Sequence, residues 1–313
     1  MRTYSATTKG GGGDKGILMA GAATHGGPGR CAAHVGFESP RPSRNKTHHI
    51  MKRFANIKSI AMLTVAISAI SCSIKEDRTP CPCWLDIDIT SCAEHTNEVT
   101  LAGYNGSRLF SETVAVADYP ITYEAVVTKG MVTSTAFTGL KDSRIEGSKI
   151  LIPEGSESDQ LRVHSVLVDC TGESAMDKVE LHRQYATVHL SMKGEDAEVN
   201  PYDLRIIGDV CGIDITTLSP VSGAFQFSPK KDSDGTWIFR LPRQNEDTGI
   251  RAELLLDGSI VDLLPLHEWI RQTGYSWNEK DLKEIYIGVD FGQCSVSVSI
   301  QGWNEGESLD IRI

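Results

Sequence analysis

Histidine and cysteine are the residues of this 313-residue chain whose chemistry suits metal binding or nucleophilic catalysis. His182 and His189 lie seven positions apart in one strand-like segment, and an odd spacing in a strand turns two side chains to opposite faces. We therefore do not expect them to bind one metal ion together. His95 and His164 are isolated in the sequence, and we interpret them as ordinary surface or core histidines.

The cysteine spacing does not indicate a metal or redox site. Cys81-Pro82-Cys83 has one intervening residue, whereas zinc and dithiol sites use Cys-x-x-Cys, and zinc sites also need a second ligand pair. Six cysteines beyond position 72 allow 15 complete pairings, so the sequence leaves open both a structural disulfide and free thiols: Cys81, Cys83, Cys92, Cys170, Cys211 and Cys294. We predict no metal and no cofactor.

Catalytic motifs are missing from the sequence. No serine lies in a Gly-x-Ser-x-Gly turn, and Asp290-Phe291-Gly292 occurs without the other kinase motifs, so we interpret it as a strand that turns at glycine. Acidic pairs such as Glu305 and Glu307 are typical of a solvated surface. We predict no catalytic residue and conclude that the chain is not an enzyme.

The segment that begins at Met51 has the plan of a secretory signal. Three basic residues follow within seven positions, and residues 60–70 form an apolar run of 11, well short of the ~20 that span a membrane. Small residues then precede Cys72. This order resembles the lipobox of bacterial lipoproteins, in which the cysteine becomes the mature N-terminus and carries acyl chains. Cys72 is therefore the predicted lipid-attachment residue.

The chain is predicted to divide at this signal. Residues 1–50 are Gly-rich and lack periodicity, and a secretory signal must be N-terminal to be read, so we predict translation from Met51 and a non-structural leader before it. Residues 51–71 are the predicted signal peptide. The rest is divided into N-terminal and C-terminal β-domains, residues 72–193 and 194–313, at the polar stretch that starts near Lys193.

Charge is distributed unevenly along the chain. Residues 1–71 carry ten Lys/Arg and two Asp/Glu, whereas residues 72–313 carry 21 and 39. A body this acidic repels phosphate backbones, so we exclude nucleic acid as a partner.

Short strands separated by turn residues dominate the mature chain, which is typical of a β-sandwich. The first block of predicted strands comprises Trp84 to Ile89, Leu109 to Val116, Tyr119 to Val127, Val132 to Phe137, Leu161 to Val168 and Ala186 to Met192. The second block comprises Leu204 to Ile207, Gly223 to Phe227, Thr236 to Leu241, Ile250 to Leu256, Ile260 to Leu264, Glu284 to Phe291 and Cys294 to Trp303. We predict an all-β fold.

One short amphipathic helix interrupts this pattern. Its apolar positions are Leu263, Leu264, Leu266, Trp269 and Ile270, with Pro265 in the first turn and Gly274 at the end.

These features together resemble the FimB-like fimbrillin-associated anchor family, lipoproteins of the fimbriae of certain Gram-negative bacteria. The similarity covers about residues 72–305, and the extra cysteines and the N-terminal extension depart from it. The motifs that carry it are Lys75 to Pro82 after Cys72, Leu181 to Leu190, Leu266-His267-Glu268-Trp269-Ile270, Tyr275-Ser276-Trp277 and Ile300-Gln301-Gly302-Trp303. The segment Leu181 to Leu190 looks like the strand that closes the family's first domain.

The resemblance implies two tandem transthyretin-like β-sandwich domains, with the short helix in the second. It also implies a lipoprotein of the cell outer membrane at the fimbrium base, held by acyl chains on Cys72, which anchors the fimbria and limits its length. Its partners would be major and minor fimbrial subunits, joined by β-strand addition. The strand Cys294 to Trp303 is the candidate critical element, either for a partner or for its own domain.

An alternative from another class stays open. A surface glycan- or nutrient-binding lipoprotein could also use tandem β-sandwiches, and exposed aromatic platforms would favour it, because sugars stack on them. Aromatic residues are 7% of the chain. We expect Trp84, Trp237 and Trp303 to be buried in strand patterns.

Overall fold

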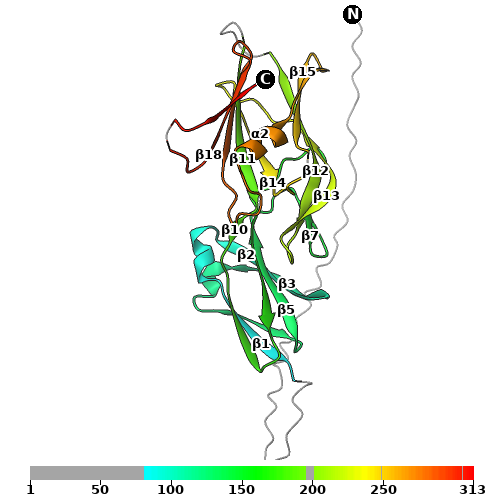
Figure 1. Cartoon of the computed structure of the whole chain (residues 1–313). Coiled ribbons are helices and arrows are strands. Elements are labelled where there is room, and N and C mark those ends of the chain that lie inside the picture. The colour runs from blue at the N-terminus through cyan, green and yellow to red at the C-terminus, as the bar shows by residue number, and fades with distance from the viewer. Residues whose placement is uncertain (1–80, 195–200, 248, 305) are drawn as a thin grey trace, which may run out of the picture. The chain divides into compact units, whose positions relative to one another are not determined.

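The computed structural model describes residues 81–194, 201–247, 249–304 and 306–313, all within one compact unit. These residues form nineteen strands, one α-helix and two 3₁₀ turns. The strands build four sheets that pack in pairs, as Figure 1 shows. The predicted fold class, all-β with two tandem sandwiches and a short helix in the second, is confirmed. In the part of the chain described, no helix is long and apolar enough to cross a membrane.

The first sandwich packs a three-stranded sheet on a five-stranded sheet. The first has the order β4-β1-β9, with β1 (Cys83–Asp88), β4 (Tyr123–Val127) and β9 (Ser174–Lys178). The second has the order β10-β8-β5-β2-β3, with β2 (Glu98–Asn105), β3 (Ser107–Ala115), β5 (Met131–Thr138), β8 (Arg162–Asp169) and β10 (His182–Arg183). Alternation along β1 buries Leu85 and Ile87 completely between the sheets.

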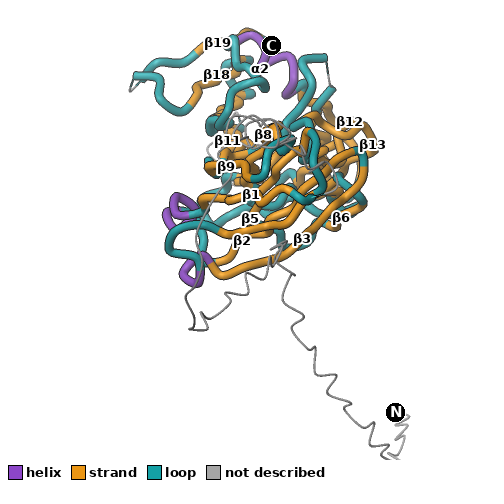
Figure 2. Tube along the Cα trace, turned by 90° about the horizontal axis from the view of Figure 1, so that it is seen from below, coloured by secondary structure: helices purple, strands orange, loops and turns teal. Residues whose placement is uncertain are grey.

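Two 3₁₀ turns close one end of this sandwich. They are η1 (Thr90–Glu94) and η2 (Val116–Asp118), and they lie beside each other in Figure 2. Each contributes one buried side chain to the core, Cys92 and Val116.

The second sandwich is larger. One sheet has the order β14-β11-β17-β18-β19, with β11 (Tyr185–Lys193), β14 (Trp237–Pro242), β17 (Ile285–Asp290), β18 (Ser295–Ile300) and β19 (Leu309–Arg312). The facing sheet has the order β16-β15-β12-β7-β6, with β13 also paired to β12; its strands are β6 (Arg144–Glu146), β7 (Lys149–Leu151), β12 (Asp203–Asp214), β13 (Ser219–Phe227), β15 (Arg251–Leu256) and β16 (Ser259–Leu264).

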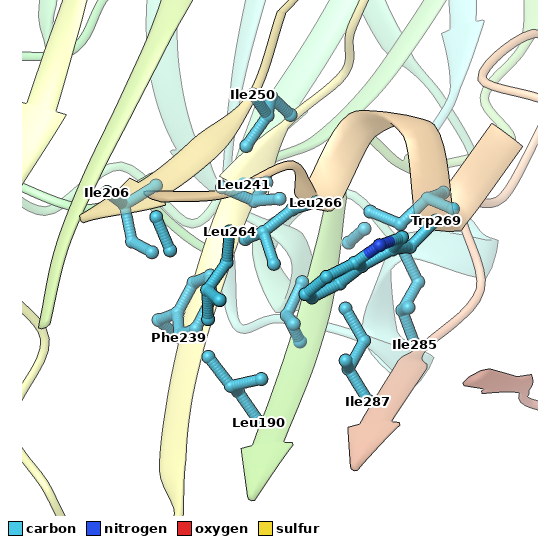
Figure 3. Close-up of a cluster of buried hydrophobic side chains, with 14 of the residues drawn as sticks. Leu190, Ile206, Phe239, Leu241, Ile250, Leu264, Leu266, Trp269, Ile285 and Ile287 are labelled. Atoms are coloured by element: carbon cyan, nitrogen blue, oxygen red, sulfur yellow. The ribbon is translucent and has the colours of Figure 1, made fainter. Parts of the chain in front are cut away.

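Helix α2 (Leu266–Gln272) completes the core of the second sandwich. Pro265 is its N-cap residue, and Gly274 has φ 75° just beyond its end, so the two predicted boundary residues are confirmed. Leu266, Trp269 and Ile270 are buried, and in Figure 3 the Trp269 ring lies beside Ile285 and Ile287 of β17. Leu263 and Leu264 differ from the prediction, because both lie on β16 and not on the helix; Leu263 is exposed and Leu264 is buried.

The two sandwiches are joined by strand pairing and by a buried cluster as well as by the chain that connects them. The hairpin β6–β7 follows β5 in the chain, yet β7 pairs with the far end of β12, where Gly212 lies opposite Leu151. A third buried cluster lies beside this hairpin and combines side chains from both halves of the chain: Ala102, Tyr104, Phe137, Ile150, Leu161, Val163, Ile213 and Ile215. Separating the sandwiches would expose this cluster.

One strand assignment was wrong. We expected Ala186 to Met192 to close the first block, and instead β11 pairs with β14 and, in parallel, with β17. Its alternation is as predicted, with Ala186, Val188, Leu190 and Met192 buried, but they face the second core. The sheets of both sandwiches have one face to bury, so the pattern alone does not choose between the first core and the second. The domain limits 72–193 and 194–313 stay a prediction.

Candidate functional site

The predicted lipid-attachment residue, Cys72, lies outside the described residues. Close beyond it along the chain, Cys81 is half-buried and Cys83 begins β1 with a fully buried side chain. The structure thus does not test lipid attachment.

The predicted independence of His182 and His189 agrees with the geometry. They lie on different strands, because Gln184 separates β10 from β11. His182 Nδ1 lies 2.9 Å from Oδ2 of Asp281, and the His189 ring stacks on Tyr286 with centroids 4.5 Å apart. In the described ranges, no three His, Cys, Asp or Glu side chains gather as a metal site.

His164 does have a specific partner, which the sequence did not reveal. Its Nε2 lies 3.1 Å from Oδ1 of Asp177, and both side chains are largely buried. Its Nδ1 accepts the Glu180 N–H at 3.1 Å, so Nε2 carries the proton and donates it to the carboxylate. The pair joins β8 to β9 and has a structural role between the two sheets.

A polar network surrounds the connection between the sandwiches. The Arg183 N–H donates to Oδ1 of Asp281 at 2.7 Å, and its guanidinium Nε donates to the Leu282 carbonyl at 2.5 Å. Burial opposes the charge of Asp281, but the hydrogen bonds from the Arg183 N–H and from His182, with the charge of Arg162, hold the pKa of that carboxyl below its usual value. The loop before β17 is therefore fastened to β10.

Arg243 fastens the same loop from the other side. It is 7% exposed, and its guanidinium donates to Gln184 Oε1 at 2.7 Å and to the Glu279 carbonyl at 2.8 Å, with a further bond to the Trp277 carbonyl. Burial lowers the pKa of this guanidinium. Carbonyl and amide acceptors thus satisfy a buried cation whose role is to hold the chain in place.

Two open clefts flank this network, with volumes of about 600 and 680 Å³. Polar and charged side chains predominate in both linings, and no Phe, Tyr or Trp is among them. Neither cleft has the aromatic platform that sugar stacking would use.

Strand β18 corresponds to the predicted hairpin strand Cys294 to Trp303, but it runs only from Ser295 to Ile300. It pairs with β17 on one side and β19 on the other, and Val296, Val298 and Ile300 are buried in its own core. The prediction of a hairpin is confirmed, while β19 was not foreseen. Both edges of β18 are occupied along most of its length, so it closes its own domain.

The feature that suits strand pairing is β16, the end strand of the six-stranded sheet. It follows β15, labelled in Figure 1, through a turn at Asp257-Gly258, where both residues have positive φ. Ile260, Val261 and Leu263 are each about half exposed, at 51%, 50% and 53%. One side of β16 pairs with β15, and no described strand pairs with its other side.

This edge is unlike the other sheet ends. Among the described residues, each remaining end strand, including β13, has at most one large exposed apolar side chain, for example Val126 on β4 and Ile238 on β14. Proteins usually protect edge strands with charge, short length or a bulge. The strand and its turn were visible in the sequence; its position at a sheet end was not.

Asp262 is the charged residue of this edge. Its Oδ1 accepts the Leu263 N–H at 2.8 Å, which indicates that this N–H points away from β15. The register also shifts between Leu254 and Leu255 of the facing strand, so the pairing is irregular here. An incoming strand would have to displace the aspartate to reach the Leu263 N–H.

Comparisons with known proteins support the fold. No family model matches the chain, and no curated protein matches it. A Bacteroides thetaiotaomicron structure described as a polysaccharide-binding protein has a TM-score of 0.51 at 17% identity, covering 74% of this chain and 98% of its own. A Bacteroides ovatus structure described as an adhesin has a TM-score of 0.51 at 12% sequence identity. The match covers 77% of this chain and 98% of that one. The fimbrial anchor Mfa2 of Porphyromonas gingivalis has a TM-score of 0.50 at 12% sequence identity. The match covers 71% of this chain and 98% of Mfa2.

The chain shares its fold with a fimbrial anchor. It shares the same fold with structures described as an adhesin and as a polysaccharide-binding protein, and at these identities the likeness concerns the fold alone. The structural half of the resemblance drawn from the sequence is thereby confirmed.

Proposed function

We propose that the chain is an outer-membrane lipoprotein that anchors a fimbria at its base and limits its length. Acyl chains on Cys72 hold it in the membrane, and a major or minor fimbrial subunit pairs with the open edge of β16. The observation that carries the proposal is this edge: among the described residues β16 pairs with β15 alone and has three half-exposed apolar side chains, on the fold of a fimbrial anchor.

Strand addition explains why this edge would bind. Backbone hydrogen bonds to an added strand contribute affinity, and alternating pockets select the side chains of the donor. Each half-exposed apolar side chain contributes about 1 kcal/mol when its burial is completed. The best donor is an extended segment with alternating branched apolar residues. Basic residues at its ends would meet Asp257 in the β15–β16 turn and a mature body with 21 Lys/Arg against 39 Asp/Glu.

The tether accounts for the N-terminal sequence. One acyl chain gives marginal membrane binding, and stable anchoring takes two or more signals, which an acylated lipoprotein cysteine supplies. The proposed organisation is a leader at 1–50, a signal peptide at 51–71, and mature domains at 72–193 and 194–313. The acidic body adds no attraction to anionic head groups.

Glycan binding is the second candidate, favoured by the description of the Bacteroides thetaiotaomicron structure. The two polar clefts lack aromatic linings, and Trp237 is buried, as expected, whereas Trp84 and Trp303 are half-buried. These observations favour the anchor.

The deciding experiment is deletion of the gene in the native host, with re-introduction of wild-type or Cys72→Ala protein. Under the proposal, deletion leaves fimbriae long or shed into the medium, wild type restores them, and Cys72→Ala moves the protein to the soluble fraction without restoring them. Normal fimbriae after deletion, together with lost uptake of a glycan, would replace the anchor with the second candidate.

A further inference from the structure

Three of the cysteines are completely buried in the first sandwich: Cys83, Cys92 and Cys170. Cys92 belongs to the turn η1, and burial, followed by the charge of Asp88, raises the pKa of its thiol to about 11. The other two lie at the start of β1 and directly after β8, so they come from opposite sheets.

Backbone pairing brings Cys83 and Cys170 to the same end of the sandwich. Cys83 lies opposite Val127 of β4. Three residues further along the chain, Gly130 exchanges two hydrogen bonds with Cys170, at 2.9 and 3.4 Å. A second route agrees with the first, because the Trp84 N–H donates to the Glu173 carbonyl at 2.9 Å.

The side chains meet in the interior. Both residues are fully buried in the same hydrophobic cluster, so their side chains turn inward from the two sheets. Besides burial, the Cys83 thiol is one of the groups that raise the pKa of Cys170, as expected of two thiols that lie close together. Among the described cysteines, this is the pair that backbone pairing and a shared buried cluster bring to the same place. Of the pairings that the sequence left open, the geometry favours this one.

We infer that Cys83 and Cys170 form a disulfide bond that links the two sheets of the first sandwich. The two thiols lose two protons and two electrons, and the S–S bond forms through a mixed disulfide with a disulfide-containing oxidant, which is reduced to two thiols. Exported proteins meet such oxidants, whereas the cytoplasm keeps thiols reduced.

Burial determines when the bond can form. The thiolate is the attacking species, and burial, with the neighbouring Cys83 thiol and Asp169, raises the pKa of Cys170 to about 11. Few thiolates therefore exist in the folded protein at neutral pH, and oxidation takes place while the sandwich is still open. Under the proposed function, the bond also joins β1, the first strand after the tether, to the opposite sheet; this consequence rests on that proposal.

The test maps the disulfide in the full-length Cys72→Ala chain, unfolded, reduced, and refolded with oxidised glutathione. Free thiols are alkylated in denaturant, and the unreduced digest is analysed by mass spectrometry. The expected product is a linked peptide pair containing Cys83 and Cys170, lighter by two hydrogens than the separate peptides and released by dithiothreitol. Alkylation of both cysteines without prior reduction, or a link to another cysteine, would overturn the inference.

A second measurement tests the contribution to stability. Reductant is expected to lower the Tm of the oxidised protein by roughly 5–15 °C, as for a disulfide that closes a long loop. Cys83→Ala/Cys170→Ala should show no effect of reductant, while the exposed-cysteine control Cys294→Ala keeps the full shift. An unchanged Tm on reduction of the wild type would contradict the inference, whatever the fimbrial phenotype is.

Discussion

His164 and Asp177 connect the two sheets of the first sandwich, with Nε2 of the histidine 3.1 Å from Oδ1 of the aspartate. Asp177 is 6% exposed and His164 lies on β8, so the carboxylate is held inside the sandwich by an imidazole from the opposite sheet. A buried charge of this kind is stable only while its partner is present.

Removal of the imidazole should therefore destabilise the fold. His164→Ala is expected to lower the free energy of unfolding by about 2–3 kcal/mol, measured by urea denaturation, because it removes the Nε2–H donor and leaves the buried Asp177 carboxyl without this hydrogen bond. His164→Ala/Asp177→Asn, which removes the charge as well, should be less damaging than the single variant. A double variant that loses the sum of the two single effects would show that the pair does not interact.

Asp281 gives the protein an acid-sensitive contact. Because folding lowers the pKa of this carboxyl, the folded state binds the proton more weakly than the unfolded state. The stabilisation is complete above the unfolded value of ~3.9 and is lost as pH falls through the folded value. Asp281→Asn should cost about 1 kcal/mol at pH 7, a modest figure because the side chain is half exposed.

The pH dependence distinguishes the charge from the side-chain shape. The difference in urea midpoint between wild type and Asp281→Asn should shrink as pH is lowered below ~4, because the wild-type carboxyl becomes neutral. A difference that stays constant from pH 7 to pH 3 would exclude the charge as the cause.

Arg243 should be irreplaceable by lysine. Its planar guanidinium donates to several carbonyl and amide oxygens at once, whereas an ammonium presents a single charged point. Arg243→Lys is expected to lower the free energy of unfolding by about 2–3 kcal/mol, since it leaves buried acceptors unsatisfied. Trypsin should then cleave earlier at Lys280 or Lys283. Wild-type proteolysis rates would show that the loop does not depend on Arg243.

Charged substitutions at the β16 edge are expected to weaken partner binding without lowering the stability of the fold. Val261→Lys/Leu263→Lys places two charges on exposed positions, so the Tm should stay unchanged while capture of fimbriae from an outer-membrane extract falls at least tenfold. Ile121→Lys, at an apolar position of 76% exposure in the first sandwich, is the matched control. Equal capture by both variants would remove β16 from the proposal and leave the tether intact.

Asp262 provides a change in the opposite direction. Asp262→Ala frees the Leu263 N–H and removes a charge from the edge, so capture should increase. Weaker capture by this variant would indicate that the aspartate itself contacts the partner.

Val298 tests the role of β18 in its own domain. Strand β18 lies between β17 and β19, and the Val298 side chain is fully buried in the core. Val298→Asp therefore places a carboxylate in an apolar core at a cost of about 3–5 kcal/mol. The purified variant should show a lower urea midpoint, and loss of fimbrial anchoring in cells should follow from loss of folded protein. A normally stable variant with defective anchoring would return β18 to the list of partner-binding strands.

Local signals in the sequence were enough to predict many elements. The alternation Val296, Val298, Ile300 predicted β18, and Pro265 and Gly274 predicted the limits of α2, because period, turn and helix-cap preferences act over a few residues. The all-β class follows from the same local pattern repeated along the chain.

Only the tertiary structure decided which strands lie side by side. It placed β11 with β17 and β7 with β12, put β16 at an open edge, and brought together Cys83 with Cys170 and His164 with Asp177. A strand with one apolar face can satisfy that face against any sheet, so its own residues do not name its neighbour. The neighbours are chosen by pairing and packing between segments far apart in the chain. The proposed binding edge is the side of β16 that this choice leaves without a partner strand among the described residues.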